Sequence, residues 1–231
     1  TETGVLTLVE GGCHFGNQGN TIETVVATRG MTVIGDHLYC AGGGFWSNTK
    51  LFEFTKDCDE VTRTLDLSGE FISGICKTGD HEIVVATCGR SGSLKSYLTF
   101  VDTKTMSEKP ISADISAELM NSSGITLAGD YLYFAAGTLT VSRISLKTWK
   151  IEEYIHVKDD APQAEYLTCN VVADSKKNLL YVSVSNDLNE AQTSDGNILV
   201  YDCSGDKPQL VTNLVNRGSY PVNIYPMSKF Y

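Results

Sequence analysis

The sequence predicts an all-β protein, a β-propeller, and three observations predict it. A phrase of glycine, four residues and Gly-Asp occurs three times, and two weaker copies follow it. The copies start at residues 30, 74, 124, 169 and 221, and this spacing of about 40 to 50 residues is typical of propeller blades. Beyond one possible turn at 115–119, no segment carries the apolar period of an α-helix.

Each unit repeats the same order of four strands. The first strand runs into a Gly-Asp or Asp-Ser turn, because glycine and aspartate tolerate a positive φ. The strands that follow are rich in β-branched and aromatic residues. We expect second strands at 38–40, 83–86, 131–134 and 180–184, third strands at 50–54, 98–101, 139–142 and 198–201, and fourth strands at 61–65, 150–155 and 209–212.

The two ends of the chain together have the length of one further unit. Residues 221–231 would supply its innermost strand, and residues 1–29 its outer strands. We therefore expect a single domain over residues 1–231, a five-bladed propeller whose last blade is built from both termini. Such closure hides the sheet edges that an open array exposes. The alternatives are a fragment of a seven-bladed propeller, a β-sandwich, or a stack of unrelated hairpins.

Composition excludes several classes of protein. The 231 residues are 42% hydrophobic and 20% charged, which excludes a disordered or collagen-like chain. No run of eighteen apolar residues occurs, so no membrane-spanning segment is expected. The net charge of -10 gives no general field that would attract nucleic acid, and no nucleic-acid partner is expected.

Neither catalysis nor a cofactor is indicated by the motifs. The chain has no G-x-S-x-G, H-E-x-x-H or P-loop sequence. His37 and His81 follow Gly-Asp in two repeats, which we interpret as turn chemistry. The inner strands offer few oxygen ligands for a hard cation, so no metal site is expected. The seven cysteines are an odd number; buried thiols are favoured, and one or two disulfides remain open.

Four short phrases carry a resemblance to a known superfamily. The turns at 101–105 (V-D-T-K-T) and 200–205 (V-Y-D-C-S-G) are similar to the phrase V-x-D-x-x-T/S-G, the opening 4–11 is followed by Phe-Gly-Asn at 15–17, and Gly-Ser-Tyr-Pro occupies 218–221. The chain thereby resembles the YVTN and quinoprotein-like β-propeller repeat superfamily, which includes the exported cell-surface members. The resemblance implies a secreted or cell-surface protein. Some relatives capture cobalamin-type or siderophore-type ligands and pass them to a transporter.

The variable loops predict where a ligand would bind. In a propeller, the loops between second and third strands share one face with the connections between blades, and loops on a rigid scaffold commonly bind ligands. Aromatic side chains mixed with arginines suit a planar or sugar-like ligand, or a peptide hot spot. The candidate ligand-binding residues on this face are Arg29, Phe45, Trp46, Arg90, Tyr166, Asn186, Arg217 and Tyr220.

Three functions are compatible with these observations. The first is a non-catalytic, exported binding protein that captures a small molecule or a glycan on the loop-rich face. The second is a protein–protein interaction scaffold or a self-assembling surface or fibre component, for which an oligomer is possible. A metal-dependent propeller hydrolase or cyclase is the third, and the lack of inward-facing metal ligands disfavours it.

Overall fold

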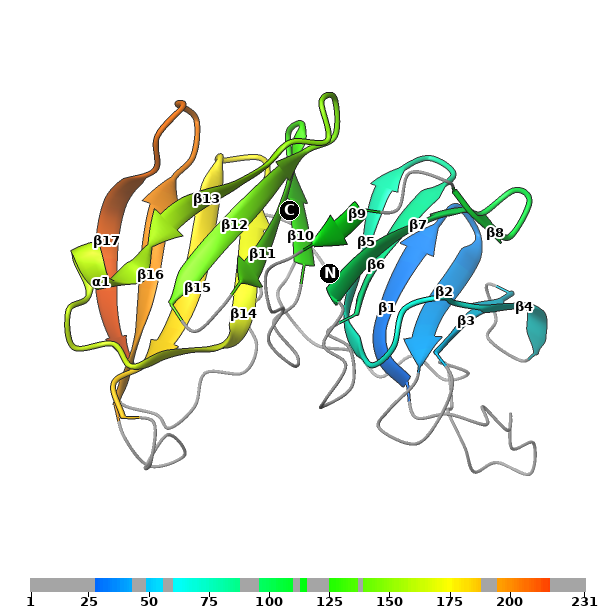
Figure 1. The fold of residues 1–231 in the computed structure, drawn as a ribbon, viewed down its shortest axis with the longest axis horizontal. Coiled ribbons are helices and arrows are strands. Elements are labelled where there is room, and N and C mark those ends of the chain that lie inside the picture. The colour runs from blue at the N-terminus through cyan, green and yellow to red at the C-terminus, as the bar shows by residue number, and fades with distance from the viewer. Residues whose placement is uncertain are drawn as a thin grey trace, which may run out of the picture.

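The computed structural model confirms the all-β class. It describes residues 28–42, 49–55, 60–87, 96–109, 113–115, 125–136, 139–187 and 195–216. These residues form four antiparallel sheets (Figure 1). In each sheet four strands neighbour one another in chain order, and one sheet has a fifth strand.

Each sheet begins within three residues of one of the first four repeat copies. The first contains β1 (Thr28–Ile34), β2 (His37–Gly42), β3 (Lys50–Phe54) and β4 (Val61–Asp66). The second contains β5 (Ile72–Gly79), β6 (Glu82–Thr87), β7 (Ser96–Asp102) and β8 (Ser107–Glu108), and β9 (Ala113–Ile115) also pairs with β7. The third contains β10 (Ile125–Ala128), β11 (Tyr131–Ala136), β12 (Thr140–Ser145) and β13 (Ile151–His156). The fourth contains β14 (Tyr166–Asp174), β15 (Leu179–Ser185), β16 (Gly196–Asp202) and β17 (Gln209–Asn216).

The first strands of successive sheets lie beside one another. Strand β1 contacts β5, β5 contacts β10, and β10 contacts β14. The four sheets therefore follow one another in chain order, as their colours in Figure 1 show. The turns between first and second strands and between third and fourth strands share one end of each sheet. We call this the turn end, and the opposite end the loop end.

The turn between first and second strands depends on a positive φ in three sheets. Gly35 and Gly129 have φ values of 58° and 56°, a conformation that glycine adopts without steric penalty. Asn178 has φ 56° in the fourth sheet. In the second sheet β5 continues through Gly79 by way of a bulge, and the turn falls on Asp80 and His81. The Gly-Asp turn is thus confirmed in the first and third sheets and starts one residue later in the second.

The core consists of apolar layers between successive sheets. One cluster joins Ala41 and Leu51 to Ile83 of the second sheet. Residues on alternate positions of the second sheet, such as Phe100, join the third sheet, and a further cluster joins the third to the fourth. Because successive side chains of a strand point to opposite faces, the second and third sheets carry apolar layers on both faces.

The face of the first sheet that points away from the second sheet is also buried. Leu38, Cys40, Phe52 and Phe54 alternate with the residues that face the second sheet and form a separate cluster. Their exposed fractions are only 8%, 0%, 5% and 0%, although this cluster contains no residue of the other described sheets.

Two elements differ from the sequence-based expectation. The second sheet has a short fourth strand, β8, followed by β9, and the sequence between them contains Pro110, which has no N–H for a sheet ladder. A single helical turn, α1 (Val157–Asp160), follows β13. The described residues contain no helix long and apolar enough to cross a membrane. The fifth unit lies almost entirely outside the described residues.

The described cysteines include two free thiols, Cys40 and Cys203. Cys40 is completely buried on β2, which agrees with the expectation of a small buried side chain. Burial raises the pKa of each of these two thiols to about 11. Both are therefore protonated and weakly nucleophilic at neutral pH.

Candidate functional site

Most of the candidate binding residues fall outside the described part of the chain. Five of them, Phe45, Trp46, Arg90, Arg217 and Tyr220, lie beyond it. Arg29 lies on β1 and Tyr166 begins β14, while Asn186 follows β15. Because Thr28 pairs with Gly42 and Tyr166 pairs with Ser185, these three positions lie at the loop ends of their sheets.

Asn186 takes part in a ladder of side-chain amides across the fourth sheet. Its Nδ2 donates a hydrogen bond to Asn197 Oδ1 at 2.9 Å, and Asn197 Nδ2 donates to Asn213 Oδ1 at 2.5 Å. The side-chain carbonyl oxygen of Asn186, Oδ1, is buried and has no hydrogen-bond partner among the described residues. Buried side-chain oxygens are usually hydrogen-bonded, so this atom is a candidate ligand contact at the loop end.

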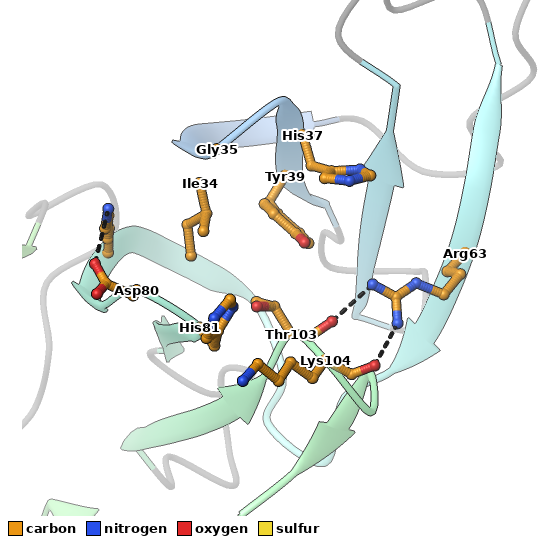
Figure 2. Close-up of a pocket in the computed structure, with 10 residues that line it drawn as sticks. Ile34, Gly35, His37, Tyr39, Arg63, Asp80, His81, Thr103 and Lys104 are labelled. Atoms are coloured by element: carbon orange, nitrogen blue, oxygen red, sulfur yellow. Dashed lines mark hydrogen bonds and ion pairs between the residues drawn. The ribbon is translucent and has the colours of Figure 1, made fainter.

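A pocket of about 440 Å³ lies at the turn end, between the first and second sheets. We call it the turn pocket, and Figure 2 shows its walls. Three turn-end segments and β4 line it. The lining residues are Ile34, Gly35, His37, Tyr39, Arg63, Lys77, Asp80, His81, Thr103 and Lys104.

Arg63 fixes one wall of the turn pocket by joining the two sheets. Its Nε donates to Glu53 Oε1 at 3.0 Å, and its Nη2 also hydrogen-bonds Oε2 of the same carboxylate. On the other side, Nη1 donates to the carbonyl of Lys104 at 2.9 Å and Nη2 to that of Thr103 at 2.6 Å (Figure 2). One guanidinium thus connects β4 to the turn between β7 and β8, a role that suits its planar set of donors.

Behind this wall, the buried carboxylate of Glu53 is ionised and accepts hydrogen bonds from the polar side chains around it. Its side chain is only 3% exposed, and it accepts hydrogen bonds from Tyr39 Oη at 2.8 Å and Thr62 Oγ1 at 2.8 Å. Burial alone would raise the pKa of Glu53, but the hydrogen bonds from Arg63, Tyr39 and Thr62 lower it to about 2. Burial, followed by the hydrogen bond to Glu53, raises the pKa of Tyr39 to about 12.

Backbone hydrogen bonds fix the rim of the turn pocket. The N–H of Thr103 donates to the carbonyl of His81 at 3.0 Å, which joins two turns of the second sheet. The N–H of Lys104 donates to Asp102 Oδ1 at 2.8 Å. Backbone hydrogen bonds from Lys104 and Thr105 lower the pKa of Asp102. Lys104 is therefore held at both its N–H, by Asp102, and its carbonyl group, by Arg63.

The charged groups that line the turn pocket are mainly cationic. Arg63, Lys77 and Lys104 are opposed in the lining by Asp80 alone. Lys77 Nζ is 3.9 Å from Asp80 Oδ1, and the Asp80 side chain is 96% exposed, so this pair is a weak one. This positive lining contrasts with a chain of net charge -10.

Sequence reasoning missed the turn pocket, although one signal of it was present. His37 and His81 occupy the same place in two repeats, a pattern that by itself predicts turn residues only. Both do belong to turn-end segments, and both also line the pocket. His37 Nδ1 lies 3.6 Å from Glu53 Oε1. No local sequence pattern predicts that Arg63 lines the pocket, because its partners Thr103 and Lys104 belong to the next repeat.

The chemistry available in the turn pocket is that of hydrogen bonding and charge. Lysine ammonium groups, imidazoles and hydroxyls line it. The described residues contain no group of three or more His, Cys, Asp or Glu side chains that could hold a metal ion. No family model matches the chain, and no curated protein matches it. The resemblance to YVTN-type propellers therefore stays an expectation.

Proposed function

We propose that this protein is a non-catalytic binding protein built on a five-bladed propeller, with a small-molecule ligand in the turn pocket. The observation that carries the proposal is the pocket itself, about 440 Å³ in volume, a size usual for small-molecule sites. Its walls are fixed by Arg63 and by the hydrogen bond from Thr103 to His81. A fixed wall lowers the entropy lost on binding.

The buried outer face of the first sheet supports ring closure. Phe52 and Phe54 lie there with exposed fractions of 5% and 0%, which requires a further layer over that face. The sequence predicts that residues 1–29 and 221–231 form the fifth blade, but residues 28 and 29 belong to β1. We propose that the segments before β1 and after β17, residues 1–27 and 217–231, supply this layer. The described four-stranded sheets then account for the other four blades.

Native mass spectrometry of the protein purified from its source under non-denaturing conditions tests the binding function. We expect a bound small molecule on the wild type. His81→Trp should remove it, because the indole fills the pocket from the turn of the second sheet. Asp36→Trp is the matched control, since Asp36 is exposed in the neighbouring turn and does not line the pocket. Equal ligand occupancy in all three proteins, or no ligand in any, would contradict the proposal.

A second candidate is a glycan or small-molecule site at the loop end. The side-chain oxygen of Asn186, which is buried and has no hydrogen-bond partner within the described ranges, favours it. The variant Trp46→Ala distinguishes a binding role of Trp46 from a packing role. Loss of a binding contact should weaken ligand binding by about 2 kcal/mol with little change in melting temperature. Loss of packing should instead lower the free energy of unfolding by about 3 kcal/mol.

A further inference from the structure

We infer that the turn pocket takes an anionic small molecule, one that carries a phosphate or a carboxylate group. This inference rests on the proposed binding function and names the class of ligand. Three observations support the anionic class. Some of the lining cations are already paired with carboxylates, the backbone of Lys104 is held in place, and apolar side chains line the pocket beside it.

The lining cations differ in how far they are already neutralised. Arg63 is fully engaged by Glu53 and by two backbone carbonyls. Lys77 has a distant and exposed partner in Asp80. The ammonium group of Lys104 forms no ion pair with any residue in the described ranges, and Figure 2 shows its side chain extending along the pocket wall away from Arg63. Lys104 is therefore the cation available to a ligand.

Lys104 is held in place before any ligand binds. Its N–H is bound to Asp102 Oδ1 and its carbonyl oxygen to Arg63 Nη1. Arg63 itself is oriented by the buried Glu53. The carboxylate of Glu53 thus acts on the site indirectly, since it aligns the arginine that holds the lysine turn. A cation fixed at its backbone loses less conformational freedom when it pairs with an anion.

Glu53 and Asp80 do not cancel the attraction for an anion. The negative charge of Glu53 is compensated by Arg63 at hydrogen-bond distance, and its side chain is only 3% exposed. The carboxylate of Asp80 points into solvent, where water screens it. An anion in the pocket therefore meets Lys104, Lys77 and the imidazole of His81, and the one carboxylate that lines the pocket, Asp80, is screened by water.

The pocket also has apolar surface and room for an organic part of the ligand beyond its charged group. Ile34 and the ring of Tyr39 form part of the lining (Figure 2), and the phenol of Tyr39 already donates to Glu53. A volume of about 440 Å³ is larger than a bare inorganic anion fills. The geometry therefore fits an organic anion such as a sugar phosphate or a sugar acid better than free phosphate.

Isothermal titration calorimetry with four probes tests the inference: glucose 6-phosphate, glucuronate, glucose and inorganic phosphate. We expect at least one of the two organic anions to bind at least about tenfold more tightly than both glucose and inorganic phosphate. Lys104→Met should weaken that binding about tenfold or more. Lys147→Met is the matched control, because Lys147 lies in the corresponding turn of the third sheet and pairs with Asp130; it should leave the affinity unchanged.

The pattern across the probes identifies the charged group. Binding of glucose 6-phosphate alone indicates a phosphate ligand, and binding of glucuronate alone a carboxylate ligand. The inference is overturned if glucose binds as tightly as the anions, if Lys104→Met binds like the wild type, or if neither organic anion binds at about 10 mM. A neutral co-purifying molecule that His81→Trp removes would overturn the anionic class and leave the binding function standing.

Discussion

Arg63 and Arg143 each connect one sheet to the following sheet through hydrogen bonds to backbone carbonyl groups. Arg143 lies on β12 opposite Glu152, and its Nε donates to that carboxylate at 2.6 Å. Its Nη2 reaches the carbonyl of Asp206 in the next sheet at 3.3 Å. In the first sheet the acid is on the third strand and the arginine on the fourth, whereas the third sheet has the reverse order. In both cases an arginine reaches the last turn of the following sheet.

Replacement of Arg63 should destabilise the protein strongly. Arg63→Met leaves the buried Glu53 carboxylate without its cation, and breaking a buried ion pair in this way costs about 3 to 5 kcal/mol. Equilibrium unfolding in urea measures the change. Lys50→Met removes the partner of the exposed Asp66 carboxylate and should cost less than about 1 kcal/mol. Similar losses for the two variants would show that Arg63 does not hold the sheets together.

The ionisation of Glu53 should make stability depend on pH in the acid range. Its pKa falls from 4.5 to about 2 on folding, so the ionised side chain contributes stability that is complete above about pH 4.5. That contribution, on the order of 3 kcal/mol, is lost as the pH falls toward 2. Thermal melts of wild type and Glu53→Gln from pH 6 to 2 measure it. The difference in stability between the two should shrink with acidity; a constant difference would contradict the lowered pKa.

Among the elements, one position on the third strand lies at each boundary between successive described sheets. Glu53, Phe100 and Arg143 occupy equivalent places on third strands, since their cross-strand partners are Tyr39, Val84 and Tyr133. Phe100 contacts Trp149 of the third sheet edge to face, with ring centroids 4.7 Å apart. The second-to-third boundary therefore uses an aromatic contact where the boundaries on either side use an arginine.

Loss of this aromatic contact should weaken the boundary between the second and third sheets. Trp149→Ala should lower the free energy of unfolding by about 2 kcal/mol, because it removes a half-buried indole and an edge-to-face ring pair. Thermal denaturation followed by circular dichroism measures the change. Lys150→Ala, at the exposed neighbouring position, should have little effect. An unchanged melting temperature for Trp149→Ala would show that the ring pair does not stabilise the boundary.

The sequence predicts individual hairpins far better than contacts between sheets. Strand β3 has the expected bounds, and the four sheets match the first four repeats, because local alternation and turn residues determine hairpins. The short helix α1 was missed, since a single turn has no detectable period. The bulges in β4, β13 and β17 also have no local signal. The turn pocket depends on contacts between residues about 40 positions apart, such as Arg63 and Thr103.

At the scale of the whole molecule, closure of the ring can be tested by truncation. Both faces of the first sheet are buried, the inner one against the second sheet and the outer one in a cluster that contains no residue of the other described sheets. We expect the closing blade to cover the outer face. Deletion of residues 1–27 should expose the cluster around Phe52 and Phe54 and abolish cooperative unfolding. Differential scanning calorimetry measures the transition. If the truncated chain melts like the full chain, a blade built from both termini is excluded.

The charge distribution of the molecule is consistent with a binding site confined to one place. The net charge of -10 repels anions from most of the surface, whereas the turn pocket presents Lys77 and Lys104. An anionic ligand would therefore meet a local attraction at one boundary between sheets. High salt should weaken its binding, because exposed charges are screened beyond about 8 Å at physiological ionic strength.

A crystal structure of the protein grown with glucose 6-phosphate and with glucuronate would locate the ligand. We expect electron density for one of these anions in the turn pocket, with its charged group at hydrogen-bond distance from Lys104 Nζ. Density beside Asn186 at the loop end, with an empty turn pocket, would show that the turn pocket is not the ligand site.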